Sequence, residues 1–196
     1  MNLQTNLSNG VTLIELMVTI AIAAILLAVV APNMQPFLIN SKLSSISTEF
    51  ISTINLARSE AARLGVNVTI CRRDGTSCTT SGDGNWNNGW IVWADKDADG
   101  SMDSDEKLRI AETLPDGYSL YGADPASSAT LRHNIAYGRS GTATEAAIFA
   151  ICHESDETQA KAVSITLTRP RTTTSTDTDG TPLKDDGTAI NSCENP

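Results

Sequence analysis

The chain lacks the short sequence patterns that mark the common enzyme classes. It contains no G-x-S-x-G, no H-E-x-x-H and no glycine-rich phosphate loop, and it has only two histidines. His153 directly follows Cys152 in a segment that reads as a strand, so the two side chains point to opposite faces and make a poor catalytic dyad. The other histidine, His133, has no obvious partner. We therefore expect a protein that is not an enzyme.

Basic residues are also scarce. Fourteen Lys and Arg against 23 Asp and Glu give a formal net charge of −9, and the basic residues are scattered rather than grouped. A chain of this charge is repelled by nucleic-acid phosphates, so the composition argues against bulk nucleic-acid binding. No Lys or Arg occurs in residues 1–10.

Only four cysteines are present, and none of them forms a C-x-x-C pair. This spacing argues against a zinc site or a redox motif and favours disulfides in an oxidising compartment. Four cysteines allow three pairings, and the sequence alone does not choose among them. Locality favours Cys71 with Cys78 across a short Asp-Gly loop, which leaves Cys152 with Cys193 to tie the end of the chain to a strand.

An apolar segment is the clearest feature that the chain does have. It runs from Val11 to Ala31, just before Pro32, and its 21 residues would extend about 31 Å as a helix, enough to cross a bilayer core. Glu15 interrupts the segment near its start, where a charge at membrane depth costs roughly 2.5–3.5 kcal/mol. Thr12-x-x-Glu15 fits a capping box, which is one use for this carboxylate.

The start of the chain resembles the class III signal of type IV pilins and type II secretion pseudopilins, through Gly10-Val11-Thr12-Leu13-Ile14-Glu15-Leu16 and the apolar run behind it. The resemblance implies that a prepilin peptidase cuts between Gly10 and Val11, removes a leader of residues 1–10, and leaves the helix in a mature subunit that is methylated. It also implies that Glu15 pairs with the amino terminus of a neighbouring subunit and sets the axial register. The leader departs from the family pattern because it has no basic residue and because Val11 stands where Phe is usual.

The apolar segment is predicted to begin a long, kinked helix. Pro32 and Pro36 each remove a helix hydrogen bond, so we expect the transmembrane and assembly helix, residues 11–37, to bend or melt locally there. The helix then resumes over residues 38–65 and ends at Gly65. Its apolar stripe follows steps of three and four through Leu43, Ile46, Phe50, Ile54, Ala57, Ala61 and Leu64.

The rest of the chain reads as strands. The predicted strands cover residues 66–71, 90–94, 107–111, 118–121, 146–152 and 162–167, separated by clusters of Gly, Asp, Asn and Pro. No second helix is evident, and Trp86, Trp90 and Trp93 are expected in the core. The fold class is therefore α+β, a long kinked N-terminal helix packed on an antiparallel sheet. We expect the head to cover residues 38–196, with a β-rich part at 66–170 and an irregular tail at 171–196.

The head resembles the FimT/FimU minor pilins and the GspH pseudopilin. The matching residues are Phe50-Ile51, Ala57-Arg58-Ser59-Glu60-Ala61, Val68-Thr69-Ile70-Cys71 and Trp86-x-x-Gly89-Trp90-Ile91-Val92. This resemblance implies a pilin-like fold and a subunit of low copy number near the tip of a pilus, where it helps prime assembly. The implied partners are other minor and major pilins, the prepilin peptidase and the inner membrane, crossed once with the head in the periplasm. A type II secretion pseudopilin is the alternative.

DNA uptake is a third function that the resemblance suggests. FimT proteins that bind DNA resemble one another in a Gly-Arg-x-Arg motif, and the corresponding segment here is Thr168-Arg169-Pro170-Arg171, without the glycine. Arg169 and Arg171 are the candidate phosphate contacts. The acidic composition favours a solvated loop instead.

The segment from Asp95 to Glu106 matches the calcium loop of an EF-hand. It places Asp95, Asp97, Asp99, Asp103 and Glu106 at ligand positions and Gly100 at the sixth position. The flanking segments read as strands rather than helices, so a solvated acidic turn is the alternative. Calcium is the only cofactor that the sequence suggests.

Overall fold

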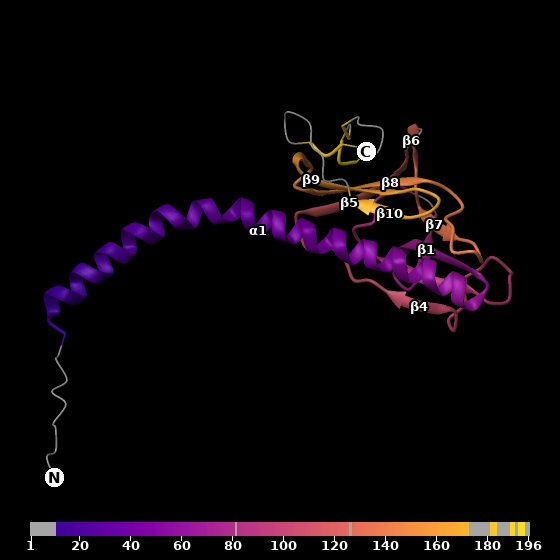
Figure 1. The fold of residues 1–196 in the computed structure, drawn as a ribbon, viewed down its shortest axis with the longest axis horizontal. Helices are drawn as coiled ribbons and strands as arrows, with labels where there is room; N and C mark the ends of the chain where they lie inside the picture. Colours follow the sequence, from indigo (N-terminus) through magenta and orange to yellow (C-terminus); the bar gives the residue numbers. More distant parts are fainter. Residues whose placement is uncertain are drawn as a thin grey trace, which may run out of the picture. The chain divides into compact units, whose positions relative to one another are not determined.

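The computed structural model describes residues 11–80, 82–125, 127–172, 181–183, 189–190 and 192–194. The chain divides into two compact units, residues 1–38 and residues 39–196, and we call the second unit the head. A single helix, α1 (Leu13–Leu64), contributes to both units. It continues through Pro32 and Pro36 (Figure 1), so the local melting predicted there is not seen. Each proline removes one helix hydrogen bond, and the neighbouring bonds remain.

Within the head, α1 presents the predicted apolar stripe to the core. Six stripe residues are at most 3% exposed: Leu43, Ile46, Phe50, Ile54, Ala57 and Ala61. The helix ends at Gly65, which has a φ of +68° and donates its N–H to the carbonyl of Ala61 at 2.9 Å. This is the predicted C-cap, because glycine adopts the left-handed conformation without steric cost.

The strands among the described residues form two antiparallel sheets. They are β1 (Asn67–Asp74), β2 (Ser77–Thr79), β3 (Trp90–Asp95), β4 (Lys107–Ile110), β5 (Tyr118–Asp124), β6 (Ser127–Leu131), β7 (Asn134–Tyr137), β8 (Ala147–His153), β9 (Asp156–Ile165) and β10 (Pro170–Thr172). The first sheet has the order β2-β1-β3-β4, with β7 also paired to β1. The second sheet has the order β10-β9-β8-β5-β6.

Each of the six predicted strands is present, and the α+β class is confirmed. Four short strands of three to five residues each were not predicted: β2, β6, β7 and β10. The strand β9 also begins earlier than predicted, because its first residues are polar and largely not buried. The short strands are stabilised by pairing with longer strands distant in sequence, as when β7 pairs with residues 68–71 of β1.

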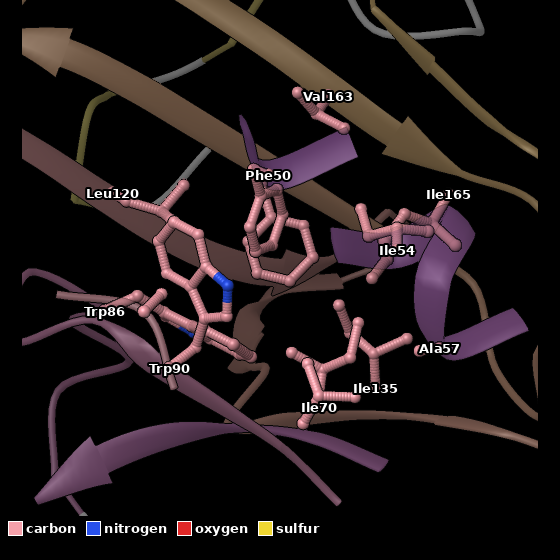
Figure 2. Packing of buried hydrophobic residues seen from close by; sticks show 14 of the residues in the cluster. Phe50, Ile54, Ala57, Ile70, Trp86, Trp90, Leu120, Ile135, Val163 and Ile165 are labelled. Carbon is pink, nitrogen blue, oxygen red and sulfur yellow. The ribbon is translucent and has the colours of Figure 1, made fainter. Parts of the chain in front are cut away.

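The core lies between the head helix and one face of each sheet. Phe50, Ile54 and Ala57 of α1 meet side chains of both sheets (Figure 2), and the two tryptophans in view come from β3 and the segment before it. The Trp90 Nε1–H donates to Thr53 Oγ1 at 3.2 Å, and the Trp86 Nε1–H donates to the Arg132 carbonyl at 2.8 Å. The indoles are therefore buried with their donors satisfied, as expected for core residues.

Both sheets are also covered on the face that points away from α1. Along β8 the side chains alternate, so that Phe149 and Ile151 join the helix-side core while Ile148 and Cys152 join a separate cluster with Cys193. Along β3, Trp90 and Val92 face the helix, and Ile91 and Trp93 face a third cluster that contains Cys71. This two-sided burial explains why β3 and β8 are apolar almost throughout.

Candidate functional site

The first candidate site is the start of α1. Thr12 caps the helix, because its Oγ1 accepts a hydrogen bond from the Glu15 N–H at 3.3 Å. This is half of the predicted capping box. Glu15 lies in the first turn and is exposed. Gly10 lies outside the described residues, so cleavage after it stays a prediction.

The apolar side chains that follow Glu15 are uncovered. From Leu16 to Leu27 the large apolar residues are each at least half exposed: Leu16, Met17, Val18, Ile20, Ile22, Ile25, Leu26 and Leu27. A helix that is apolar on all sides is stable only when something apolar surrounds it. Across the described residues, no helix meets the length and hydropathy expected of a membrane span.

The second candidate site is the acidic loop, residues 95–106, which connects β3 to β4. The structure gathers Asp95, Asp97 and Asp99, whose carboxylate oxygens lie within 4.8 Å of one another. Ala98 and Gly100 have φ values of +64° and +75°, so the backbone turns tightly between them. Desolvation raises the pKa of Asp103 most, and the Asp99 carboxylate raises it further. A bound cation would reduce the repulsion among these carboxylates.

The other two predicted ligands, Asp103 and Glu106, are not part of this group of three carboxylates. Glu106 is 3% exposed, and its two oxygens accept the backbone N–H groups of Lys96 at 2.6 Å and Asp103 at 3.2 Å. Its carboxylate therefore already organises the loop and would have to share those bonds with an ion. The flanks are strands, as the sequence indicated.

Both predicted disulfides form, between Cys71 and Cys78 and between Cys152 and Cys193. The first joins β1 to β2 on the outer face of the first sheet, where the Cys78 sulfur lies 3.7 Å from the Met102 sulfur of the acidic loop. The second attaches the C-terminal segment to the outer face of the second sheet. The first disulfide therefore packs, with Met102, against Ile91 and Trp93 on the outer face of its own sheet, and the second fixes the C-terminal segment over the outer face of the second sheet. The cysteine spacing indicated neither role.

A partly buried polar contact between Arg72 and His133 could not be foreseen from the sequence. The Arg72 guanidinium lies 2.8 Å from Nδ1 of His133 and 3.3 Å from a carboxylate oxygen of Asp83, and its Nε–H donates to the Asn85 carbonyl. These residues connect β1, the loop before β3 and the turn before β7. Burial and then the Arg72 charge lower the pKa of His133, against a smaller raising effect of Asp83.

The lowered pKa of His133 predicts a pH dependence of stability. The unfolded chain binds the proton at the ordinary pKa of about 6.5, whereas the folded protein binds it only at lower pH. The contribution of His133 to the free energy of unfolding is therefore fully present above about pH 6.5 and declines as the pH falls below that value. We expect His133→Asn, which keeps an acceptor for Arg72 but does not titrate, to lose less stability than the native chain between about pH 7 and pH 5. Denaturant unfolding at each pH measures this, and equal pH dependence of the two proteins would refute it.

The two candidate DNA contacts lie close together in sequence, Arg169 in the turn between β9 and β10 and Arg171 in β10. Arg169 and Arg171 are both exposed. The turn is closed by the Thr166 N–H, which donates to the Arg169 carbonyl. Binding of DNA by this pair stays a prediction.

Comparison with known proteins identifies the family. The sequence profile described as "Type II transport protein GspH" matches residues 47–170, well over half of the chain. The chain belongs to the GspH family. A second profile, "Prokaryotic N-terminal methylation motif", matches residues 5–31, which contain Gly10 and Glu15. No curated protein sequence is similar enough to count as a match.

Two crystal structures of the type IV minor pilin FimU from Pseudomonas aeruginosa share the fold of this GspH-family chain. They superpose with a TM-score of 0.52 at 18% and 19% identity, covering 78% and 77% of this chain and 96% and 99% of the FimU chains. The minor pseudopilin EpsH from the type 2 secretion system of Vibrio cholerae is less similar, with a TM-score of 0.42 at 15% identity over 67% of this chain and 95% of EpsH. The pilin-like fold predicted from sequence is confirmed.

Proposed function

We propose that this chain is a minor subunit of a type IV pilus. The apolar helix anchors the precursor in the inner membrane with the head in the periplasm, and after cleavage it enters the helical core of the fibre near its tip. There the subunit contacts other minor and major pilins and helps prime assembly. The main support is the uncovered apolar helix within the N-terminal methylation motif, immediately before a head of the GspH family.

Glu15 has a specific role in this proposal. Once the leader is removed, the new amino terminus at Val11 carries a positive charge in an apolar bundle. The carboxylate of Glu15 on a neighbouring subunit neutralises that charge and fixes the axial register. Removing one partner of such a buried pair leaves the other charge unpaired, at a cost of roughly 3–5 kcal/mol.

Replacing Glu15 by alanine should therefore reduce incorporation into fibres roughly a hundredfold or more, while membrane insertion is at least as efficient as in the native chain. Quantifying the subunit in sheared fibres and in membranes measures both effects. Thr12→Ala is the matched control, because it removes the cap acceptor and leaves the carboxylate. Normal incorporation of Glu15→Ala would reduce Glu15 to a helix cap and contradict the proposal.

A type II secretion pseudopilin is the alternative function, and the description of the family profile favours it. The same helix and head would serve in either fibre. A strain from which this chain has been deleted distinguishes the pilus function from the pseudopilus function. Loss of surface pili with normal protein secretion supports the pilus, and loss of secretion with normal pili supports the pseudopilus.

We also propose that the acidic loop binds calcium, because three of its carboxylates converge within 4.8 Å. An ion that binds only the folded head raises its stability by about 2.7 kcal/mol at a hundredfold excess over Kd, which corresponds to a rise in Tm of about 5–10 °C. Melting the head with calcium and with chelator measures the shift. Asp97→Asn with Asp99→Asn should abolish it, and Asp105→Asn, at a position that is not a ligand, should not. Coincident curves for the native head would exclude the site.

A further inference from the structure

The outer face of the first sheet carries a buried cluster that the acidic loop helps to cover. The cluster consists of Cys71, Ile91 and Trp93, each at most 7% exposed. Met102 of the acidic loop and Cys78 of β2 are half-buried and pack against it. The Met102 sulfur lies 3.7 Å from the Cys78 sulfur. The loop therefore meets the sheet through apolar and sulfur atoms.

One polar atom of this cluster has no partner. The Trp93 Nε1 is buried, and among the residues that the structure describes no acceptor lies within hydrogen-bonding distance of it. The other two tryptophans of the chain both donate to acceptors in the core. A buried donor without an acceptor is destabilising, because it has lost its hydrogen bonds to water. An acceptor introduced into this cluster would therefore be stabilised there.

Met102 contacts the cluster and can acquire such an acceptor by a chemical change. Its thioether sulfur is only a weak acceptor, whereas a methionine sulfoxide carries a polar oxygen on the same sulfur. Met102 is the only methionine in residues 39–196, and all four cysteines of the chain are in disulfides. An oxidant that reacts with thioethers and thiols therefore has a single target in the head.

We propose that Met102 is an oxidation site, at which a peroxide converts the thioether to a sulfoxide whose oxygen accepts the Trp93 Nε1–H. The sulfur attacks one oxygen of hydrogen peroxide, the O–O bond breaks, and the second oxygen takes the proton of the first and leaves as water. The sulfur loses two electrons and the peroxide gains them. Sulfoxide reductases reverse the change, so the modification is a switch. It concerns the head alone and does not depend on the proposed pilus function.

The backbone on both sides of Met102 is held within the loop. The Ser101 N–H donates to the Asp99 carboxylate at 2.7 Å. The Asp103 N–H donates to the buried Glu106 carboxylate at 3.2 Å. These bonds keep the intervening residue over the outer face of the sheet. Oxidation therefore changes the contact that the side chain makes and does not require the loop to open.

Mild oxidation of the head tests the site. Residues 39–196 form one compact unit that contains all three buried clusters and both disulfides, so the head can be studied by itself. Hydrogen peroxide should add one oxygen atom, and peptide mapping should place it on Met102. The control Met102→Leu keeps an apolar side chain of similar volume and should gain no oxygen. A native head that gains none under conditions that fully oxidise free methionine would overturn the proposal.

The hydrogen bond is tested by repeating the oxidation without the donor. In the native head the indole N–H compensates the sulfoxide, so the Tm should change little and the Trp93 Nε1–H proton resonance should move downfield. Trp93→Phe keeps an aromatic ring but has no donor, so oxidation should lower its Tm by roughly 3 °C or more. An equal fall in Tm in both proteins, or an unshifted Nε1–H resonance, would show that the bond does not form. The resonance of the native head decides the question even if Trp93→Phe does not fold.

Glutamine at position 102 tests the same contact without an oxidant. Its side-chain carbonyl is an acceptor on an unbranched chain, so Met102→Gln should lower the Tm less in the native head than in Trp93→Phe. Met102→Leu offers no acceptor and should affect both backgrounds equally. Equal destabilisation by glutamine in both would contradict the proposal. All of these measurements are made with chelator present, so that their outcome is separate from that of the calcium experiment.

Discussion

Replacing Gly10 by valine should leave the precursor uncut in the membrane. The resemblance of the N-terminus to the class III signal places cleavage between Gly10 and Val11. Glycine lets the peptidase approach the backbone closely, whereas a β-branched side chain at this position blocks it. The expected effect is all or none, because the leader is either removed or retained. Mass spectrometry of the subunit from membranes measures it.

The neighbouring residue supplies the control. Asn9→Ala changes a side chain in the leader but keeps Gly10, so its product should have the mature mass. A loss of ten residues from the Gly10→Val chain would show that Gly10 is not the processing site, and the class III interpretation would fail.

Replacing Gly89 by alanine should strongly destabilise the head. Gly89 has a φ of +89°, and a Cβ there would lie 2.3 Å from the Ala111 carbonyl oxygen and 2.6 Å from that of Glu112. Both neighbours are backbone atoms, so neither can rotate away. The left-handed conformation costs about 1–2 kcal/mol and the overlap about 1–3 kcal/mol or more. We therefore expect a loss of about 3 kcal/mol or more in the free energy of unfolding.

Gly75 makes the comparison specific. Its φ is +59°, and nothing lies within 4 Å of the position that its Cβ would take. Gly75→Ala should therefore cost only the conformational strain of about 1–2 kcal/mol. Denaturant unfolding of both variants separates steric overlap from backbone strain. Equal stability of the two would show that the Gly89 turn can move away from the Ala111 and Glu112 carbonyls, and the steric argument would be wrong.

Local patterns predicted the parts of the fold that depend on local chemistry. The stripe from Leu43 to Ala61 has helical spacing, and Gly65 supplies the cap, so the C-terminal end of the helix could be predicted to within a residue. The alternation along β8 likewise marks a strand. The length of β9 was underestimated because its first half is polar, although it pairs with β8 from Asp156 onward.

Contacts between distant segments could not be predicted in the same way. Arg72 and His133 are 61 residues apart, and only the pairing of β7 with β1 brings them together. The cysteine pairing followed from locality, but the packing of each disulfide on a sheet face depends on which face is apolar. The acidic loop was recognised from its spacing, yet the hydrogen bonds that occupy Glu106 depend on the path of the backbone.

The proposed pilus function is tested most directly by the N-terminus of the native subunit in purified, sheared fibres. We expect a chain that begins at Val11, carries a methylated amino group, retains its apolar helix and occurs at low copy number relative to the major pilin. A fibre fraction without the chain, together with a periplasmic form cut behind the apolar segment, would contradict it, because the helix would then be a discarded signal rather than part of a pilus.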